Sequence, residues 1–120
     1  MKKIYLFCSG GMSTSILANS MQKTADKFNI PVEVKAFPDN KVNEIVEEEN
    51  PDVILLGPQV RYRFDKIVQD LKGKNIPIEV IDSNDYGSMD GERVLKMAVK
   101  LIKELLNYDE KIRSIFYVFS

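Results

Sequence analysis

Histidine does not occur anywhere in this 120-residue chain, and that absence excludes more chemistry than any other feature of the composition. Without it the chain cannot contain a Ser-His-Asp triad or a Cys-His catalytic pair. Cysteine occurs once, at Cys8, so an internal disulfide, a CxxC redox pair and a zinc site of the usual cysteine and histidine ligands are excluded as well. We therefore expect no metal and no cofactor. If Cys8 is reactive, its own loop must activate it, or a partner protein must supply the base.

An excess of basic charge and long apolar runs are also lacking. The formal net charge of -1 provides no basic surplus to neutralise phosphates, so we expect no binding to nucleic acid. No apolar stretch approaches the roughly 20 residues of a membrane span. The apolar run after Lys2-Lys3 is too short for a signal peptide. With 44% hydrophobic and 29% charged residues, the composition predicts one soluble globular domain in the cytoplasm.

The clearest functional signal lies between Lys3 and Phe28. An apolar run at 4–7 predicts a strand that leads into Cys8, and a loop of small residues follows. The residues of this predicted loop are Ser9, Gly10, Gly11, Met12, Ser13, Thr14 and Ser15. The next segment has helical spacing of its apolar residues, which are Leu17, Met21, Ala25 and Phe28.

This strand, loop and helix predict an anion site beside a thiol. Backbone N–H groups of such a loop, together with the positive end of the helix dipole, bind anions and lower the pKa of a thiol. We interpret the segment as a phosphate-binding loop that carries the thiolate of Cys8. The alternative is a small buried cysteine next to an ordinary glycine turn.

The remainder of the chain alternates between strands and helices. Strands are predicted at 32–36, 53–56 and 78–81, and helices at 42–49, 64–71 and 94–105. Residues 4–7 and 53–56 are apolar throughout, which favours central strands, whereas the other two strands contain polar positions typical of sheet edges. The prediction is an α/β fold with a four-stranded parallel open sheet of order 2-1-3-4 and helices on both faces. Cys8 then lies where ligands bind in such sheets, at the carboxyl ends of the first and third strands.

Loops at 37–39, 57–62 and 82–87 share that end of the predicted sheet and can form a partner surface around Cys8. The candidate docking residues are Phe37, Pro38, Gln59, Tyr62 and Tyr86. The alternatives are an ordinary strand-to-helix turn at 57–59 and a solvated loop at 86–87. For Arg61 and Arg63 we favour a role in surface solubility over a contact with a phosphoryl group or an acidic partner.

Three kinds of phosphate chemistry can be compared with the loop. The Gly-Lys-Ser/Thr and GxGxxG nucleotide motifs are not matched. Low-molecular-weight tyrosine phosphatases follow their cysteine with five residues and then an arginine, and Thr14 occupies the position of that arginine. Without the bidentate guanidinium, a loop can accept and pass on a phosphoryl group but stabilises attack by water poorly. The pattern favours a carrier; a phosphatase-like hydrolase and a non-catalytic regulatory domain of the same fold stay as alternatives.

Several motifs, in their order along the chain, resemble the cytoplasmic IIB component of bacterial sugar phosphotransferase systems, in the lactose/cellobiose (chitobiose) class. These motifs are Cys8–Ser15, Ala36-Phe37-Pro38, 55–59, Ile81-Asp82, Tyr86-Gly87 and Asp90-Gly91. The resemblance covers residues 1–107 and implies a fold similar to that of the low-molecular-weight tyrosine phosphatases. Residues 108–120 form a C-terminal extension, and its apolar part, 115–119, can pack on the domain, add an edge strand or meet a partner.

The resemblance also implies a function. In that family the cysteine takes a phosphoryl group from a phosphohistidine of the IIA protein and passes it to a sugar bound by the membrane-embedded IIC protein. Cys8 is thus implied to be the phosphorylated residue, residues 10–15 the phosphate loop, and the acceptor a disaccharide of the cellobiose, chitobiose or lactose class. The donor histidine then belongs to another protein, which agrees with its absence from this chain.

Overall fold

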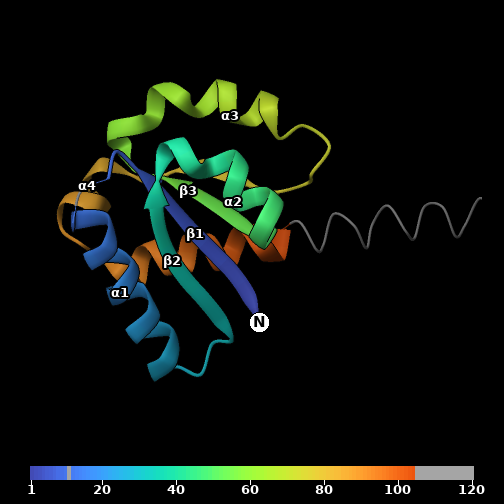
Figure 1. Cartoon of the computed structure of the whole chain (residues 1–120). Helices are drawn as coiled ribbons and strands as arrows, with labels where there is room; N and C mark the ends of the chain where they lie inside the picture. Colours follow the sequence, from blue (N-terminus) through green and yellow to red (C-terminus); the bar gives the residue numbers. More distant parts are fainter. Residues whose placement is uncertain (11, 105–120) are drawn as a thin grey trace, which may run out of the picture.

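The structure is a computed structural model that describes residues 1–10 and 12–104 (Figure 1). Within these residues four parallel strands form one sheet in the order β2-β1-β3-β4. The strands are β1 (Lys2–Cys8), β2 (Val32–Pro38), β3 (Val53–Leu56) and β4 (Ile78–Val80). The predicted strand order and parallel sense are confirmed. The predicted domain boundary at residue 107 and the extension 108–120 lie outside the described residues, as does Gly11.

Helices cover both faces of the sheet, as predicted (Figure 1). Helix α1 (Met12–Lys27) and the helical residues 91–104 pack on one face, while α2 (Val42–Glu49) and α3 (Phe64–Asp70) pack on the other. Successive side chains of β1 alternate between these two cores because a strand has a side-chain period of two. Every residue of β3, and β1 from Ile4 onward, is at most 1% exposed, which confirms that these strands are central.

Three local predictions were wrong. Helix α1 begins at Met12, inside the predicted loop, so Ser13 to Ser15 form part of its first turn. The predicted loop at 82–88 contains a short helix, α4 (Ser83–Gly87), because the carboxylate of Asp82 accepts hydrogen bonds from two backbone amides of its first turn. Phe28 follows the end of α1 and is 57% exposed instead of lying on its buried stripe.

Two 3₁₀ segments connect strands to helices at the end of the sheet where Cys8 lies. Segment η1 (Asp39–Lys41) follows β2, and η2 (Pro58–Arg63) lies between β3 and α3. Among the described residues no helix has the length and apolar character needed to cross a membrane.

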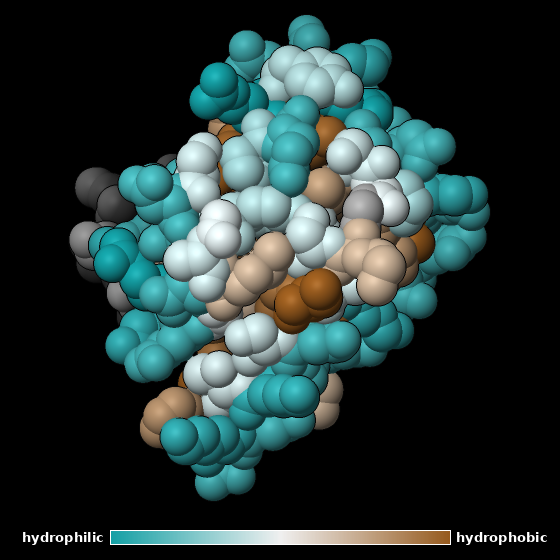
Figure 2. Space-filling model, turned by 90° about the vertical axis from the view of Figure 1, so that its left-hand side faces the viewer, coloured by the Kyte–Doolittle hydropathy of each residue, from teal (hydrophilic) through white to brown (hydrophobic). Residues whose placement is uncertain are grey.

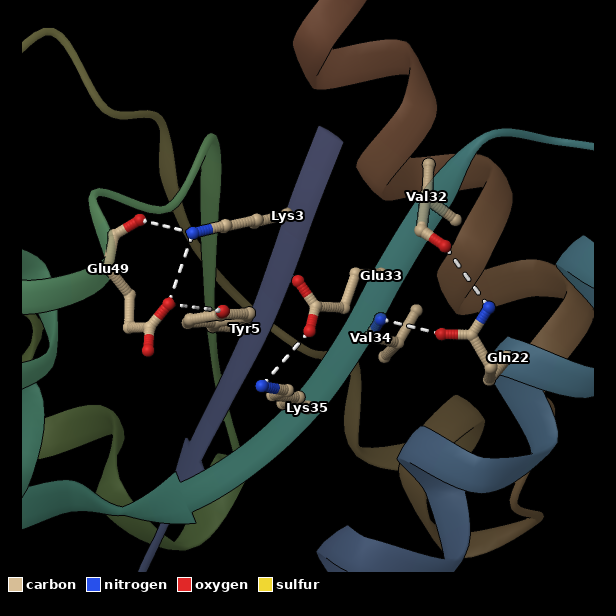
Figure 3. A network of polar contacts seen from close by, with 8 residues as sticks. All are labelled: Lys3, Tyr5, Gln22, Val32, Glu33, Val34, Lys35 and Glu49. Carbon is tan, nitrogen blue, oxygen red and sulfur yellow. Dashed lines mark hydrogen bonds and ion pairs between the residues drawn. The ribbon is translucent and has the colours of Figure 1, made fainter. Parts of the chain in front are cut away.

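Polar side chains cover the exposed edge of β2 and the start of β1 (Figure 3). The Gln22 side chain from α1 accepts a hydrogen bond from Val34 N (2.8 Å) and donates one to Val32 O (3.1 Å). These bonds satisfy backbone groups of an edge strand that would otherwise offer a site for further strand pairing. Lys3 Nζ lies 3.1 Å from Glu49 Oε2, and this hydrogen bond holds the pKa of the Glu49 carboxyl below its usual value.

Candidate functional site

Cys8 is the last residue of β1, and a neighbouring glycine allows the chain from β3 to approach it closely. Gly57 N donates to Phe7 O at 2.9 Å as the chain leaves β3. A Cβ atom at position 57 would lie 3.3 Å from Cys8 Sγ and 2.8 Å from Gln59 Oε1. Any larger residue would therefore press on the sulfur and on the amide beside it.

The thiol is buried but faces a hollow. The Cys8 side chain is 1% exposed, and it lines a hollow of about 110 Å³ together with Gly10, Thr14 and Ser15 on one side and residues 36–38 on the other. This volume is far above the ~10–15 Å³ that one water molecule needs. The sulfur is therefore buried but not surrounded by apolar side chains alone, because it faces a hollow that is also lined by Gly10 and by the first turn of α1.

The residues of the predicted phosphate loop adopt different roles. Gly10 has φ = +99°, in the region that favours glycine, so the chain can turn sharply between β1 and α1. Thr14 is 3% exposed, whereas Met12 is 80% exposed, so the methionine side chain points to solvent and only its backbone can serve an anion. The first turn of α1 contains no acidic residue, so no side chain there offsets the positive end of the helix dipole.

A cluster of hydroxyl groups joins α4 to the first turn of α1 beside the thiol. The Tyr86 hydroxyl lies 2.7 Å from Ser13 Oγ, 2.9 Å from Thr14 Oγ1 and 3.7 Å from Cys8 Sγ. Each hydroxyl has a single proton, so Ser13 can donate to Tyr86 while Tyr86 and Thr14 can direct their protons toward the sulfur. Ser9 Oγ is 3.9 Å from Cys8 Sγ, at the outer limit of a hydrogen bond to sulfur.

Tyr86 was expected on a docking rim or in a solvated loop, and the structure places it in neither. Its side chain is 6% exposed and packs into the core of the α1 face. Asp82 caps α4 and so fixes the turn on which Tyr86 stands. The capping sequence Asp82-Ser83-Asn84-Asp85 is the signal that could have indicated this helix and the inward position of the tyrosine.

These neighbours set the ionisation of the thiol. Burial raises the pKa of Cys8, but hydrogen bonds from Thr14, Tyr86 and Ser9 stabilise the thiolate and outweigh burial. The pKa of Cys8 is therefore lower than that of an ordinary cysteine, which increases the nucleophilic form near neutral pH.

Of the remaining candidate docking residues, Phe37 and Pro38 line the hollow, whereas Gln59 and Tyr62 belong to η2. Phe37 is half-buried against Phe7, with ring centroids 5.6 Å apart, while Pro38 is exposed and Tyr62 is 78% exposed. Gln59 is exposed, and its Oε1 accepts a hydrogen bond from the Cys8 thiol at 3.7 Å, so it belongs to the wall of the site as well as to the rim.

The two arginines of η2 differ in their surroundings. Arg63 Nη1 donates to Asp39 Oδ2 at 2.6 Å, and this ion pair ties η2 to η1. The guanidinium of Arg63 is thus engaged away from the thiol, and Arg61 is exposed. The exposure of Arg61 fits the predicted role in surface solubility, whereas Arg63 forms a partly buried ion pair that the sequence did not predict.

Apolar side chains that the sequence reasoning missed lie near this site. The face that carries α1 and α4 has a pale-to-brown area in the middle of a mostly hydrophilic surround (Figure 2). Met12, at the start of α1, is 80% exposed, and Ile16, one turn later, is 51% exposed. Their i, i+4 spacing places them on the same side of the helix, a pattern that is visible in the sequence once the start of α1 is known.

Comparison with known proteins identifies the family of this chain. The family model described as "PTS system, Lactose/Cellobiose specific IIB subunit" matches residues 3–97. The chain belongs to this family. It is 35% identical over 102 residues to the oligo-beta-mannoside-specific EIIB component of the phosphotransferase system of Bacillus subtilis, covering 85% of this chain and 97% of that protein.

Further relatives agree with the family and the fold. The solution structure of the cellobiose-specific phosphotransferase IIB component from Borrelia burgdorferi superimposes with a TM-score of 0.71 at 38% identity, covering 86% of this chain and 93% of that one. Over 78% of its length the chain is also 28% identical to a Staphylococcus epidermidis protein named lactose-specific EIICB component, of which it covers 16%. The chain is therefore a sugar-specific IIB component, and its fold is that of the low-molecular-weight tyrosine phosphatases, as predicted.

Proposed function

We propose that this IIB component carries a phosphoryl group on Cys8 between the IIA protein and a disaccharide bound by IIC. The observation that carries the proposal is a thiol of lowered pKa that faces a hollow at the start of α1. The thiolate attacks phosphorus, the N–P bond of the IIA phosphohistidine breaks, and the imidazole nitrogen keeps the bonding electron pair. In the second step a sugar hydroxyl oxygen attacks the same phosphorus, the S–P bond breaks and the thiolate is restored, while the hydroxyl proton passes to a base outside this chain.

The residues of the loop hold the phosphoryl group during both steps. Ser9 to Ser15 contribute backbone amides at the positive end of α1, and Gly10 lets the backbone approach the phosphoryl oxygens closely. Thr14, which stands where the phosphatases have arginine, contacts Tyr86 and offers no positive charge. Without a positive charge at this position the loop stabilises the transition state for attack by water poorly. Phosphocysteine should therefore be hydrolysed slowly, as a carrier requires.

The rim of the hollow receives the two partners in turn. Phe37 and Pro38 line the hollow, Gln59 contacts the thiol and Tyr62 is exposed on η2. The exposed side chains of Met12 and Ile16 add apolar surface at the start of α1. The Staphylococcus epidermidis relative is named an EIICB component, a name that combines the C and B components, and this supports a IIC partner for this chain. The acceptor is a sugar of the cellobiose or lactose class, and transfer takes place at the cytoplasmic side of the membrane.

The test is to incubate the full chain with its phosphorylated IIA partner and to locate the added group by peptide mass mapping. We expect one phosphoryl group on the peptide that contains Cys8, and its loss when membranes with IIC and a cognate disaccharide are added. A phosphoryl group on any other residue, or none at all, contradicts the proposal. Rapid release of inorganic phosphate without IIC would instead support a phosphatase-like hydrolase.

A Tyr86→Phe variant tests the hydroxyl cluster. Removal of the hydroxyl takes one hydrogen bond from the thiolate, so we expect the pKa of Cys8 to rise. A hydrogen bond worth about 0.5–1.5 kcal/mol corresponds to a roughly two- to tenfold slower reaction of Cys8 with iodoacetamide at neutral pH. Above both pKa values the rates of variant and wild type converge, because both thiols are then ionised.

The matched control for this measurement is Tyr62→Phe. It removes the same hydroxyl from a side chain that is 78% exposed, and it should leave the alkylation rate at every pH unchanged. If Tyr86→Phe alkylates with the wild-type pH profile, Tyr86 does not stabilise the thiolate.

A further inference from the structure

A hollow larger than the one at Cys8 lies on the same face of the sheet, between the end of α1 and the helical residues 91–104. Its volume is about 550 Å³. Its apolar wall is formed by Phe28 and Ile30 on one side and by Leu95 and Val99 on the other. Phe28 is 57% exposed, and Ile30 and Val99 are partly exposed, so the groove presents apolar side chains to solvent. Contiguous apolar surface of this kind is usually covered by another segment or by a partner.

One border of the groove carries positive charge. Lys96, Lys100 and Lys103 lie along it at spacings of four and three residues, which places them on one side of the helix. Two of these lysines already have acidic partners on the same helix: Lys96 Nζ lies 3.1 Å from Glu92 Oε1, and Lys100 Nζ lies 4.0 Å from Glu104 Oε1. The main requirement for a segment that fits this groove is therefore a run of apolar side chains for its floor.

We propose that the C-terminal residues 108–120 of the same chain occupy this groove. The described part of the helix ends at residue 104, one residue beyond Lys103, which lines the groove. From residue 104 to Ile115 the chain has 11 steps, which span up to roughly 36 Å when extended. The helix between Glu92 and Lys103 is only about 17 Å long, so residues 115–119 reach any point along it.

The apolar part of the segment matches the floor of the groove. Residues 115–119, Ile-Phe-Tyr-Val-Phe, supply large apolar side chains for it. The charged residues that precede them, Asp109, Glu110, Lys111 and Arg113, balance one another, so the match is apolar and not electrostatic. Because the segment is tethered beside the groove, its effective concentration there exceeds that of a separate chain. The segment thereby buries both its own apolar run and the exposed ring of Phe28.

The absence of tryptophan from the chain provides a direct test. A Phe119→Trp variant of the full chain contains a single tryptophan, whose emission reports on the segment alone. We expect emission at short wavelength and protection from acrylamide quenching, both independent of protein concentration. Phe116→Trp is the second reporter if the first variant unfolds at a lower temperature than the wild type.

The decisive comparison adds a groove substitution to the reporter. Phe28→Ser removes an exposed apolar side chain from the groove, and it should shift the emission to longer wavelength and remove the protection. Val68→Ser removes a side chain of α3 that is 41% exposed and does not line the groove, and it should change neither. Exposed tryptophan in the full chain, or emission insensitive to Phe28→Ser, overturns the proposal. Protection that increases with protein concentration overturns it in favour of docking by a second copy.

Discussion

A Cys8→Ser variant is expected to lose phosphoryl transfer from the IIA protein by several orders of magnitude. The serine hydroxyl is a poor nucleophile unless a base removes its proton, and the chain has no histidine to serve as that base. The cluster of Ser9, Thr14 and Tyr86 hydroxyls lowers the pKa of the Cys8 thiol, but it cannot ionise an alcohol. The measurement is the initial rate of phosphoryl incorporation from phosphorylated IIA, compared with the wild type.

Two controls separate loss of the nucleophile from loss of the fold. Serine is close to cysteine in size, and the Cys8 side chain already lies against polar groups, so the variant should unfold near the wild-type temperature. Ser9→Ala changes a neighbouring exposed residue and should keep most of the transfer activity, since Thr14 and Tyr86 still stabilise the thiolate. Incorporation into Cys8→Ser at a rate near that of the wild type would remove Cys8 from the proposed mechanism.

The fold could be predicted from the sequence because the strands carry unambiguous burial patterns. Residues 4–7 and 53–56 are apolar at every position, and a strand of a parallel sheet has such a pattern only where both faces are covered. That assignment places the polar-containing strands at the edges and leaves few right-handed connections. Cys8 could be singled out for the same reason, since it ends a central strand and precedes glycine.

The details of the site could not be predicted, because they depend on contacts between distant residues. Tyr86 meets Ser13 and Thr14 across 73 and 72 positions of sequence, and no local pattern reports such a meeting. The start of α1 was misplaced because serine and threonine are typical of loops, although they are also favoured in the first turn of a helix. The exposure of Phe28 follows from the end of α1 at Lys27: Asn29 has a left-handed backbone (φ = +56°), and only the next residue, Ile30, packs against the core.

The Thr14 side chain has a role that its position in the sequence alone does not reveal. In the sequence Thr14 occupies the position of the phosphatase arginine, which shows only that the bidentate guanidinium is missing. In the structure the same side chain is 3% exposed and hydrogen-bonded to Tyr86, and it forms part of the wall of the hollow. The position that binds the phosphoryl group through arginine in the phosphatases here helps to lower the pKa of the Cys8 thiol, as the proposed carrier requires.

A Gly91→Ala variant is expected to lose about 1–3 kcal/mol in free energy of unfolding, the usual cost of an added methyl group in a packed interior. Gly91 is the first residue of the helical segment 91–104 and is buried against α1. A Cβ atom there would lie 2.9 Å from the backbone nitrogen of Met21 and would also clash with the hydroxyl of Ser20. Since backbone atoms cannot rotate away, the two helices would have to separate, and Met21, which is fully buried beneath them, would lose contacts. Urea unfolding followed by circular dichroism measures the change.

Gly87→Ala is the matched control, because it adds the same methyl group to a nearby helix where the structure leaves room. A Cβ atom at Gly87 meets no heavy atom within 4 Å, and the residue belongs to α4. Alanine restricts the unfolded chain more than glycine does, so this variant should equal the wild type or exceed it by up to about 1 kcal/mol. Equal stability of the two variants would mean that α1 and residues 91–104 do not depend on their close approach at Gly91. A loss confined to Gly91→Ala instead identifies this glycine as the contact that holds residues 91–104 against α1, the helix whose first turn belongs to the proposed phosphate loop.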